Sequence, residues 1–333
     1  MLYDNSKTEG LPVTAGKDDD MGAEPFELIG KIRDNIHTAF VGSDAIVDKM
    51  ICCLLAEGHI LLEDVPGVGK TTLALSLANS ISCSFGRVSF SPDTLPSDIT
   101  GVSVYNTASK TFEFKPGPII NNIFLADEIN RTPPKTQSAL LEVMQEKKVT
   151  VDGAAYPIDG IFMVIATQNP VEFAGTYPLP EAQLDRFMMK ISLGYPSKED
   201  ELKLANVFLE GRKAENVGSV CSAEDIAELQ AMVKKVTVAE NVLGYIHNIA
   251  DATRKEPRFV IGASPRAMLA LIRASQANAF MSGRDFVRPD DVKQMYVPVL
   301  LHRLMLSVEA KMSKEDPETV LRGLVSKVEV PVK

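Results

Sequence analysis

The sequence predicts an α/β domain with a parallel sheet and two inserted hairpins, followed by an all-helical domain. Three observations carry this prediction. An apolar run at Ile60–Leu62 leads into a Pro/Gly turn and a helix start, and a second apolar run at Ile123–Ala126 ends in two carboxylates. Beyond residue 196, the periodic segments have helical spacing. Buried strands that alternate with helices are typical of parallel α/β sheets.

Composition limits the classes of function. The chain has 333 residues and a net charge of −9, from 35 basic and 44 acidic side chains. This acidic balance argues against a general nucleic-acid binder. No apolar run reaches the length of a membrane span, and the polar start lacks a signal-peptide pattern. The 4 cysteines show no C-x-x-C spacing and form no metal set with the 4 histidines, so we expect reduced thiols in a cytoplasmic protein.

The chain opens with an acidic segment, residues 1–24, which has six acidic residues and few apolar ones. Such a composition is typical of a disordered tail. Apolar residues at helical spacing begin at Pro25, and a break at Val41–Ser43 separates this helix from a second one. Ser43 is the expected cap of the second helix.

The segment Leu61–Thr72 lies between a strand and a helix, which is the setting of a phosphate-binding loop. Its backbone N–H groups and the helix N-terminus would face phosphates. Lys70 would reach the β- and γ-phosphates, and the Thr71 hydroxyl would bind Mg²⁺. Asp64 stands where the full pattern has its first glycine, which leaves the geometry at the start of the loop open.

The predicted nucleotide contacts come from this loop and from the turn between the two preceding helices. That turn is either plain packing or a wall for the adenine ring of ATP. The predicted residues are Val41 and Gly42 in the turn, and Pro66, Gly67, Val68, Gly69, Lys70, Thr71 and Thr72 in the loop and first helical turn.

Two hairpins interrupt the α/β pattern. The first runs from Val102 to Phe114 and the second from Val149 to Ile158, with an Asp-Gly turn. They are either surface decorations or loops that contact a client protein. In the first hairpin, strand alternation places Phe112 and Phe114 on one face, which we expect to be buried. The turn at Thr107–Lys110 is then the better contact candidate.

The apolar strand that ends at Asp127 and Glu128 carries the chemistry of the predicted site. Asp127 would hold Mg²⁺ through water, and Glu128 would act as the general base that polarises the attacking water. A carboxylate pair at a strand end is weak evidence alone. Here it follows Lys70 by 57 residues within a βαβ pattern, which makes it strong.

The next core strand, Ile161–Ala166, leads to Asn169, whose amide could hold the attacking water or the γ-phosphate. A short helix containing Arg186 precedes the last strand. The break at Gly194–Ser197 then divides the chain into a nucleotide-binding domain, 25–196, and a helical domain, 197–333.

One helix of the second domain begins at Ser264 and Pro265 and has Arg266 in its first turn. A basic residue there opposes the helix dipole. This small cost in stability is understandable if Arg266 faces a phosphate.

With these residues in view, the chain resembles the AAA+ ATPases and, within them, the MoxR family. The resemblance covers about Phe26–Leu306. Its most specific stretches are Ala126–Gln137, which reads ADEINRTPPKTQ, and Thr167–Pro170 followed by Gly175–Phe187. The two hairpins resemble the helix-2 insert and the pre-sensor-1 hairpin of the magnesium-chelatase-like branch, and the helical domain resembles the AAA+ lid.

The resemblance also implies roles for single residues. Asn169 is similar to sensor 1, Arg266 to sensor 2, and Arg186 to the arginine finger that completes a neighbouring subunit's site. Arg131 is the rival for that last role.

The activity implied is Mg²⁺-dependent ATP hydrolysis that remodels or matures other proteins. The implied assembly is a homo-hexameric ring with ATP between subunits, and the implied partners include proteins with a von Willebrand factor A domain. The alternatives are a DNA-translocating motor, the ATPase subunit of a metal chelatase, and a nucleotide-binding scaffold without turnover. The net acidity argues against the motor. The complete set Lys70, Asp127, Glu128 and Asn169 argues against the scaffold.

Overall fold

The computed structural model describes residues 23–170 and 175–331. The tail predicted for residues 1–24 lies outside them, apart from its last two residues, which begin α1. No helix in the described part of the chain is both long enough and apolar enough to cross a lipid bilayer.

The predicted parallel sheet is confirmed. It has five strands, all parallel to their neighbours, in the order β2-β5-β8-β1-β9. In that order the strands are Phe85–Ser89, Ile123–Asp127, Met163–Gln168, Ile60–Glu63 and Met189–Ile191. Neighbours in space are mostly distant in sequence, so helices connect the strands across the faces of the sheet.

Helices cover both faces of the sheet. Ile60 and Leu62 pack with the first three helices, whereas Leu61, one residue between them, packs with α5 on the opposite face. This is the alternation that a strand requires when both of its faces are buried. The helices of this part are α1 (Ala23–Ile36), α2 (Asp44–Leu55), α3 (Lys70–Ser80), α4 (Pro96–Thr100), η1 (Ile129–Arg131), α5 (Pro134–Glu146) and α6 (Glu181–Leu184).

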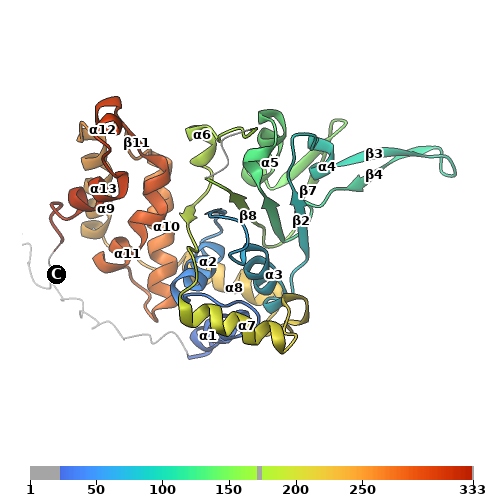
Figure 1. Ribbon diagram of the computed structural model, residues 1–333, viewed down its shortest axis with the longest axis horizontal. Helices are drawn as coiled ribbons and strands as arrows, with labels where there is room; N and C mark the ends of the chain where they lie inside the picture. The colour runs from blue at the N-terminus through green and yellow to red at the C-terminus, as the bar shows by residue number, and fades with distance from the viewer. Residues whose placement is uncertain (1–22, 171–174, 332–333) are drawn as a thin grey trace, which may run out of the picture.

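Both predicted hairpins are present. They are β3 (Gly101–Asn106) with β4 (Thr111–Pro116), and β6 (Lys148–Val151) with β7 (Ala154–Pro157). The first projects far from the body of the molecule (Figure 1).

The expectation of a buried aromatic face on the first hairpin is wrong for Phe112, which is 73% exposed. Phe114 stacks on Tyr156 of the second hairpin, with ring centroids 3.9 Å apart. The reason is geometric, because only the base of the long hairpin has a second hairpin beside it. Phe112 lies beyond this support and contacts Tyr105 across the strands, with centroids 5.3 Å apart.

The C-terminal part is helical, with one small antiparallel ribbon between β10 (Phe259–Ile261) and β11 (Met305–Leu306). Helices α9 to α13 gather on the side opposite the projecting hairpin, whereas α7 and α8 lie near α1 to α3 (Figure 1). The elements are α7 (Lys198–Leu209), η2 (Ala214–Asn216), α8 (Ala223–Val233), α9 (Glu240–Lys255), α10 (Pro265–Met281), α11 (Pro289–Leu300), η3 (Leu301–Arg303), α12 (Val308–Met312) and α13 (Pro317–Val325).

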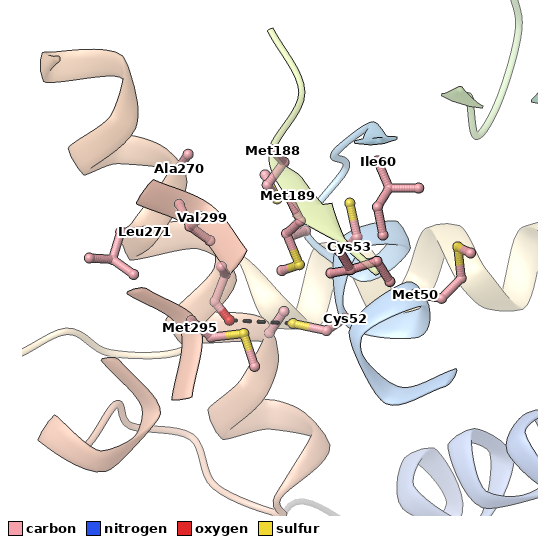
Figure 2. Close-up of a cluster of buried hydrophobic side chains, with 14 of the residues drawn as sticks. Met50, Cys52, Cys53, Ile60, Met188, Met189, Ala270, Leu271, Met295 and Val299 are labelled. Carbon is pink, nitrogen blue, oxygen red and sulfur yellow. Dashed lines mark hydrogen bonds between the residues drawn. The ribbon is translucent and has the colours of Figure 1, made fainter. Parts of the chain in front are cut away.

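The joint between the sheet and the C-terminal helices is rich in sulfur (Figure 2). Cys52 and Cys53 of α2 and Met188 and Met189 at β9 face α10 and α11, from which Met295 also points inward. The Cys52 thiol donates to the Ala274 carbonyl at 3.5 Å. Burial raises the pKa of Cys52 to about 12, so this thiol stays neutral and acts as a core side chain.

Candidate nucleotide site

A cavity of about 740 Å³ lies where the α1–α2 turn, the phosphate-binding loop and α7 meet. It brings together most of the predicted nucleotide contacts. Those on its wall are Val41, Gly42, Gly67, Val68, Gly69, Thr71 and Thr72. The turn and the loop thus face one space that is large enough for a nucleotide.

Two glycines shape the loop. Gly67 has φ 87° and Gly69 has φ 92°, a left-handed region that side-chain-bearing residues rarely adopt. Gly69 directly precedes α3, so the free N–H groups of the first helical turn open toward the cavity. The loop has the backbone that phosphate binding requires.

Lys70 is folded back onto the loop. Its ammonium donates to the carbonyl of Asp64 at 2.8 Å and to the carbonyl of Val65 at 3.2 Å. These two carbonyls are the hydrogen-bond partners of the ammonium. A phosphate would offer the ammonium a stronger partner, because hydrogen bonds between ionised groups exceed those to neutral carbonyls.

Asp64, the departure from the full loop pattern, connects the loop to the chain that leaves β9. Its buried carboxylate accepts hydrogen bonds from the Ser192 hydroxyl at 2.7 Å and from the N–H groups of Leu193 at 2.6 Å and Gly194 at 3.0 Å. Leu193 and Gly194 themselves line the cavity. A glycine at position 64 could not form these bonds.

Helix α7 also lines the cavity, which the sequence reasoning missed. Leu204, Val207 and Phe208 face the space, and Arg212 just beyond the helix donates to the Thr38 carbonyl at 3.3 Å. The three apolar residues have the i, i+3, i+4 spacing of one helical face, a signal that was available in the sequence.

Asp127 is held from two sides. Its Oδ1 accepts a hydrogen bond from the Thr167 hydroxyl at 2.7 Å, and its Oδ2 pairs with Arg87 at 2.7 Å. The same Thr167 oxygen accepts the backbone N–H of Glu128 at 2.8 Å. Neither Arg87 nor Thr167 was predicted. The contact of Arg87 follows from strand register, since Ser89 pairs with Asp127 and Arg87 lies two residues earlier on the same face of β2. Thr167 directly follows Ala166, which pairs with Ala126, the residue before Asp127.

Glu128 occupies a strained position. It has φ 59° and ψ 48°, a left-handed conformation that is uncommon for a residue with a side chain. Its carboxylate pairs with Arg131 at 3.1 Å. Strained residues are often found at functional sites, where surrounding contacts hold them in place.

Asn169 is buried at the end of β8, where its carbonyl accepts a hydrogen bond from the Asn130 amide at 3.3 Å. The residue before it, Gln168, donates to Glu63 at the end of β1, and Glu63 also pairs with Lys190 at 2.6 Å. Polar groups thus cluster at the carboxyl ends of adjacent strands, where open α/β sheets bind ligands.

Arg186 and Arg266 line a different cavity, of about 330 Å³. It shares no lining residue with the larger one. Lys147, Arg273 and Arg303 lie on the same wall together with the carboxylates of Glu57 and Asp185, so basic side chains predominate in this cavity. The structure therefore brings the two predicted arginines together, but it does not bring either one to the phosphate-binding loop of its own chain.

A phosphate-binding loop beside an Asp–Glu pair at the carboxyl edge of a parallel sheet, followed by a helical lid, defines a P-loop ATPase. Residues 59–189 match the family described as "ATPase family associated with various cellular activities (AAA)", and residues 251–324 match the AAA lid domain.

Similar proteins narrow the class further. "Chaperone MoxR1" of Mycobacterium tuberculosis is 41% identical over 87% of this chain and 79% of its own. An uncharacterised Bacillus subtilis protein, YeaC, is 48% identical over 92% and 95% of the two chains. A solved structure of a candidate ATPase from Cytophaga hutchinsonii is 39% identical in sequence and has a TM-score of 0.85. The match covers 93% of this chain and 96% of the other. The chain belongs to the MoxR family of AAA+ ATPases.

Proposed function

We propose that this ATPase uses ATP with Mg²⁺ to remodel or mature partner proteins, and that it works as a hexameric ring whose active sites are completed between subunits. The observation that carries the proposal is the split site. The loop lines one cavity and the carboxylates follow a strand of the same sheet, whereas Arg186 and Arg266 line another cavity that shares no residue with the first.

The nucleotide-binding half belongs to one subunit. ATP would draw Lys70 away from the carbonyls of Asp64 and Val65 onto the phosphates. The Thr71 hydroxyl and the Asp127 carboxylate would hold Mg²⁺, because this ion prefers oxygen ligands. The Arg87 guanidinium already lies against Asp127 Oδ2, so the carboxylate faces a position that suits positive charge. When bound, the ion would neutralise charge on the phosphates.

Within the same subunit, Glu128 would accept a proton from the attacking water. Its backbone is fixed by the Thr167 hydroxyl and its carboxylate by Arg131. Asn169, at the end of the adjacent strand, would orient the water or the γ-phosphate. Glu128 is thus held in place before the reaction, and such preorganisation is a main source of electrostatic catalysis.

The other half belongs to the neighbouring subunit. Arg186 and Arg266 share one basic cavity and would together face the phosphates of the adjacent nucleotide. An arginine supplied in trans can contribute on the order of 10³-fold or more to the rate. A closed ring supplies one such pair to every site.

The projecting β3–β4 hairpin is the proposed contact for protein clients. Tyr105 is 50% exposed and Phe112 is 73% exposed, with Val102 and Val104 also exposed beside them. Exposed aromatic rings supply large apolar contact area at low entropic cost. The naming of one relative as a chaperone supports this class of partner. The proposed partners include proteins with a von Willebrand factor A domain. The proposed location of the ATPase is the cytoplasm.

The proposal is tested with purified variants. Glu128→Gln should bind ATP with unchanged affinity and lose turnover by about 10²-fold or more, because an amide cannot accept the water's proton. Lys70→Ala and Arg186→Ala should each be inactive, and mixing them should restore part of the activity. Wild-type turnover in Glu128→Gln, or no recovery in rings proven to contain both subunits, would contradict it.

A further inference from the structure

A buried arginine from the lid holds the segment that carries Arg186. Arg303, in η3, is only 6% exposed. Its Nε donates to the Asp185 carboxylate at 2.7 Å. Its Nη atoms donate to the carbonyls of Asp185 at 3.2 Å, Phe187 at 2.7 Å, Met188 at 3.2 Å, and Val299.

These contacts lie on both sides of Arg186. Arg303 binds the backbone carbonyl of the preceding residue, Asp185, and that of the following residue, Phe187. His302 adds a second contact from the lid to the Phe187 carbonyl, at 3.0 Å. The backbone at Arg186 is therefore fixed from the lid, and its side chain has only its own rotamers left.

Asp185 connects this segment to Arg266 as well. Its carboxylate accepts a hydrogen bond from the Ser264 hydroxyl at 3.3 to 3.4 Å. Ser264 is the N-cap of α10, and Arg266 lies in the first turn of that helix. One carboxylate, on the residue before Arg186, thus contacts both the lid arginine and the N-cap of the helix that presents Arg266.

Burying Arg303 at this joint carries an energetic cost. Burying a guanidinium removes it from water, and only complete pairing offsets that loss. Burial lowers the pKa of Arg303, and Asp185 opposes this effect. An apolar residue would pack the joint at least as well. What apolar packing cannot supply is direction, because a planar guanidinium donates along fixed lines to several carbonyls at once.

We propose that Arg303, together with Asp185, is a positioning residue. It sets the lid on the core so that Arg186 and Arg266 act as one two-arginine group on the phosphates bound by the neighbouring subunit. The inference rests on the proposed function, because it assumes that this pair acts in trans.

The first expected result concerns Arg303→Lys, which keeps the positive charge and loses the planar set of N–H donors. It should lower kcat by about tenfold to a hundredfold, since misplacing a catalytic group by about 1 Å has this effect. Its own affinity for ATP should be unchanged, because its phosphate-binding loop is untouched. Asp185→Asn, which removes only the carboxylate charge, should likewise lower kcat and leave the affinity for ATP unchanged.

The matched control is Arg284→Lys. Arg284 is another lid arginine that pairs with a carboxylate, here through two bonds of 2.6 Å to the buried Asp291. Its hydrogen bonds go to Phe286 and Asp291 and not to the segment around Arg186. This variant should leave kcat near the wild-type value. Circular dichroism and ATP binding check that each variant is folded.

Two measurements separate positioning from a general structural role. Adding Arg303→Lys to Arg186→Ala should cause no further loss, because the residue acts through Arg186. Mixing Arg303→Lys with Lys70→Ala should restore activity, whereas mixing it with Arg186→Ala should not.

Additive losses in the double variant, an equal fall in Arg284→Lys, or wild-type kcat in both Arg303→Lys and Asp185→Asn would overturn the inference. These results would leave the proposed function standing if Arg186→Ala alone is inactive and is complemented by Lys70→Ala. Full activity of Arg186→Ala would instead overturn both.

Discussion

Arg131 Nε lies 3.1 Å from a carboxylate oxygen of Glu128, three residues earlier in the same chain. The short η1 helix brings the two side chains together, starting from the left-handed backbone at Glu128. Arg131 thus contacts the candidate base of its own subunit. This geometry favours a role in cis for Arg131, and it favours Arg186 as the arginine that acts on the neighbouring site.

The two arginines are therefore expected to differ in mixed rings. Arg131→Ala should lower turnover by about tenfold, because a free Glu128 carboxylate is less well positioned toward water. Mixing it with Lys70→Ala should restore nothing, since its own site stays impaired. Arg186→Ala should recover in the same experiment. Recovery of Arg131→Ala would show that it acts in trans.

Arg87 is expected to compete with Mg²⁺ for Asp127. Because the guanidinium pairs with Asp127 Oδ2, Arg87→Ala should lower the Mg²⁺ concentration for half-maximal ATP hydrolysis by about two- to tenfold. The rate at saturating Mg²⁺ should change little. Arg322→Ala, which removes a distant surface pair with Glu318, is the control and should shift nothing. An unchanged or higher Mg²⁺ requirement in Arg87→Ala would contradict this expectation.

The first hairpin offers a matched pair of aromatic substitutions. Phe112→Ser should change the free energy of unfolding by less than about 0.5 kcal/mol, because the ring is exposed. Phe114→Ser should cost about 1 kcal/mol or more, because it removes the stack on Tyr156. Denaturant unfolding measures both.

Phe112→Ser should affect only the binding of a client protein. Binding of casein, used as an unfolded test client, should weaken several-fold in Phe112→Ser while basal ATP hydrolysis stays intact. Replacing the hairpin turn Ala108–Lys110 with Gly-Ser-Gly should have a similar effect. Casein binding at wild-type strength in both variants would exclude the hairpin as the contact site.

Stability is expected to depend on pH through His59. The Val164 N–H donates to His59 Nδ1 at 3.0 Å, so the proton lies on Nε2 and is directed at the Met144 carbonyl, also at 3.0 Å. Burial lowers the pKa of His59 from 6.5 to about 4. Between these values the unfolded chain binds more protons than the folded one. The free energy of unfolding should therefore fall as the pH drops from 6.5 to 4, by about 1.4 kcal/mol per unit at most.

His59→Gln is the comparison for that slope. It should be less stable at pH 7 but should lose less stability on acidification than the wild type, measured by urea unfolding at several pH values. Equal slopes in the two proteins would show that His59 does not carry the effect.

Much of the fold could be predicted because its signals are local. The strands at Ile60 and Ile123 are short apolar runs, the loop ends at a lysine before a helix, and the Asp127–Glu128 pair follows a strand. Each feature needs only its neighbours in sequence. The turn at Val41 and Gly42 lines the same cavity as the loop, and its contact with adenine stays a prediction.

The rest depends on contacts between distant segments. The pairing of Arg87 with Asp127 requires the strand register. The bonds from Asp64 to Gly194 span 130 positions, and those from Arg303 to Asp185 span 118. Phe112 was misjudged for a related reason. Alternation tells which face of a strand a residue is on, and only the tertiary structure tells whether anything covers that face.

The sulfur-rich joint between the sheet and the lid has a mechanical consequence. Thioether side chains have three rotatable bonds and no branching, so they refill space by changing rotamer. Met188, Met189 and Met295 can therefore follow small shifts in the packing between α11 and β9 without opening a void, while the bonds of Arg303 keep the orientation of the lid on the core. Branched side chains, which have fewer rotamers, would adapt less. The joint thus absorbs local strain without changing the direction in which the lid points.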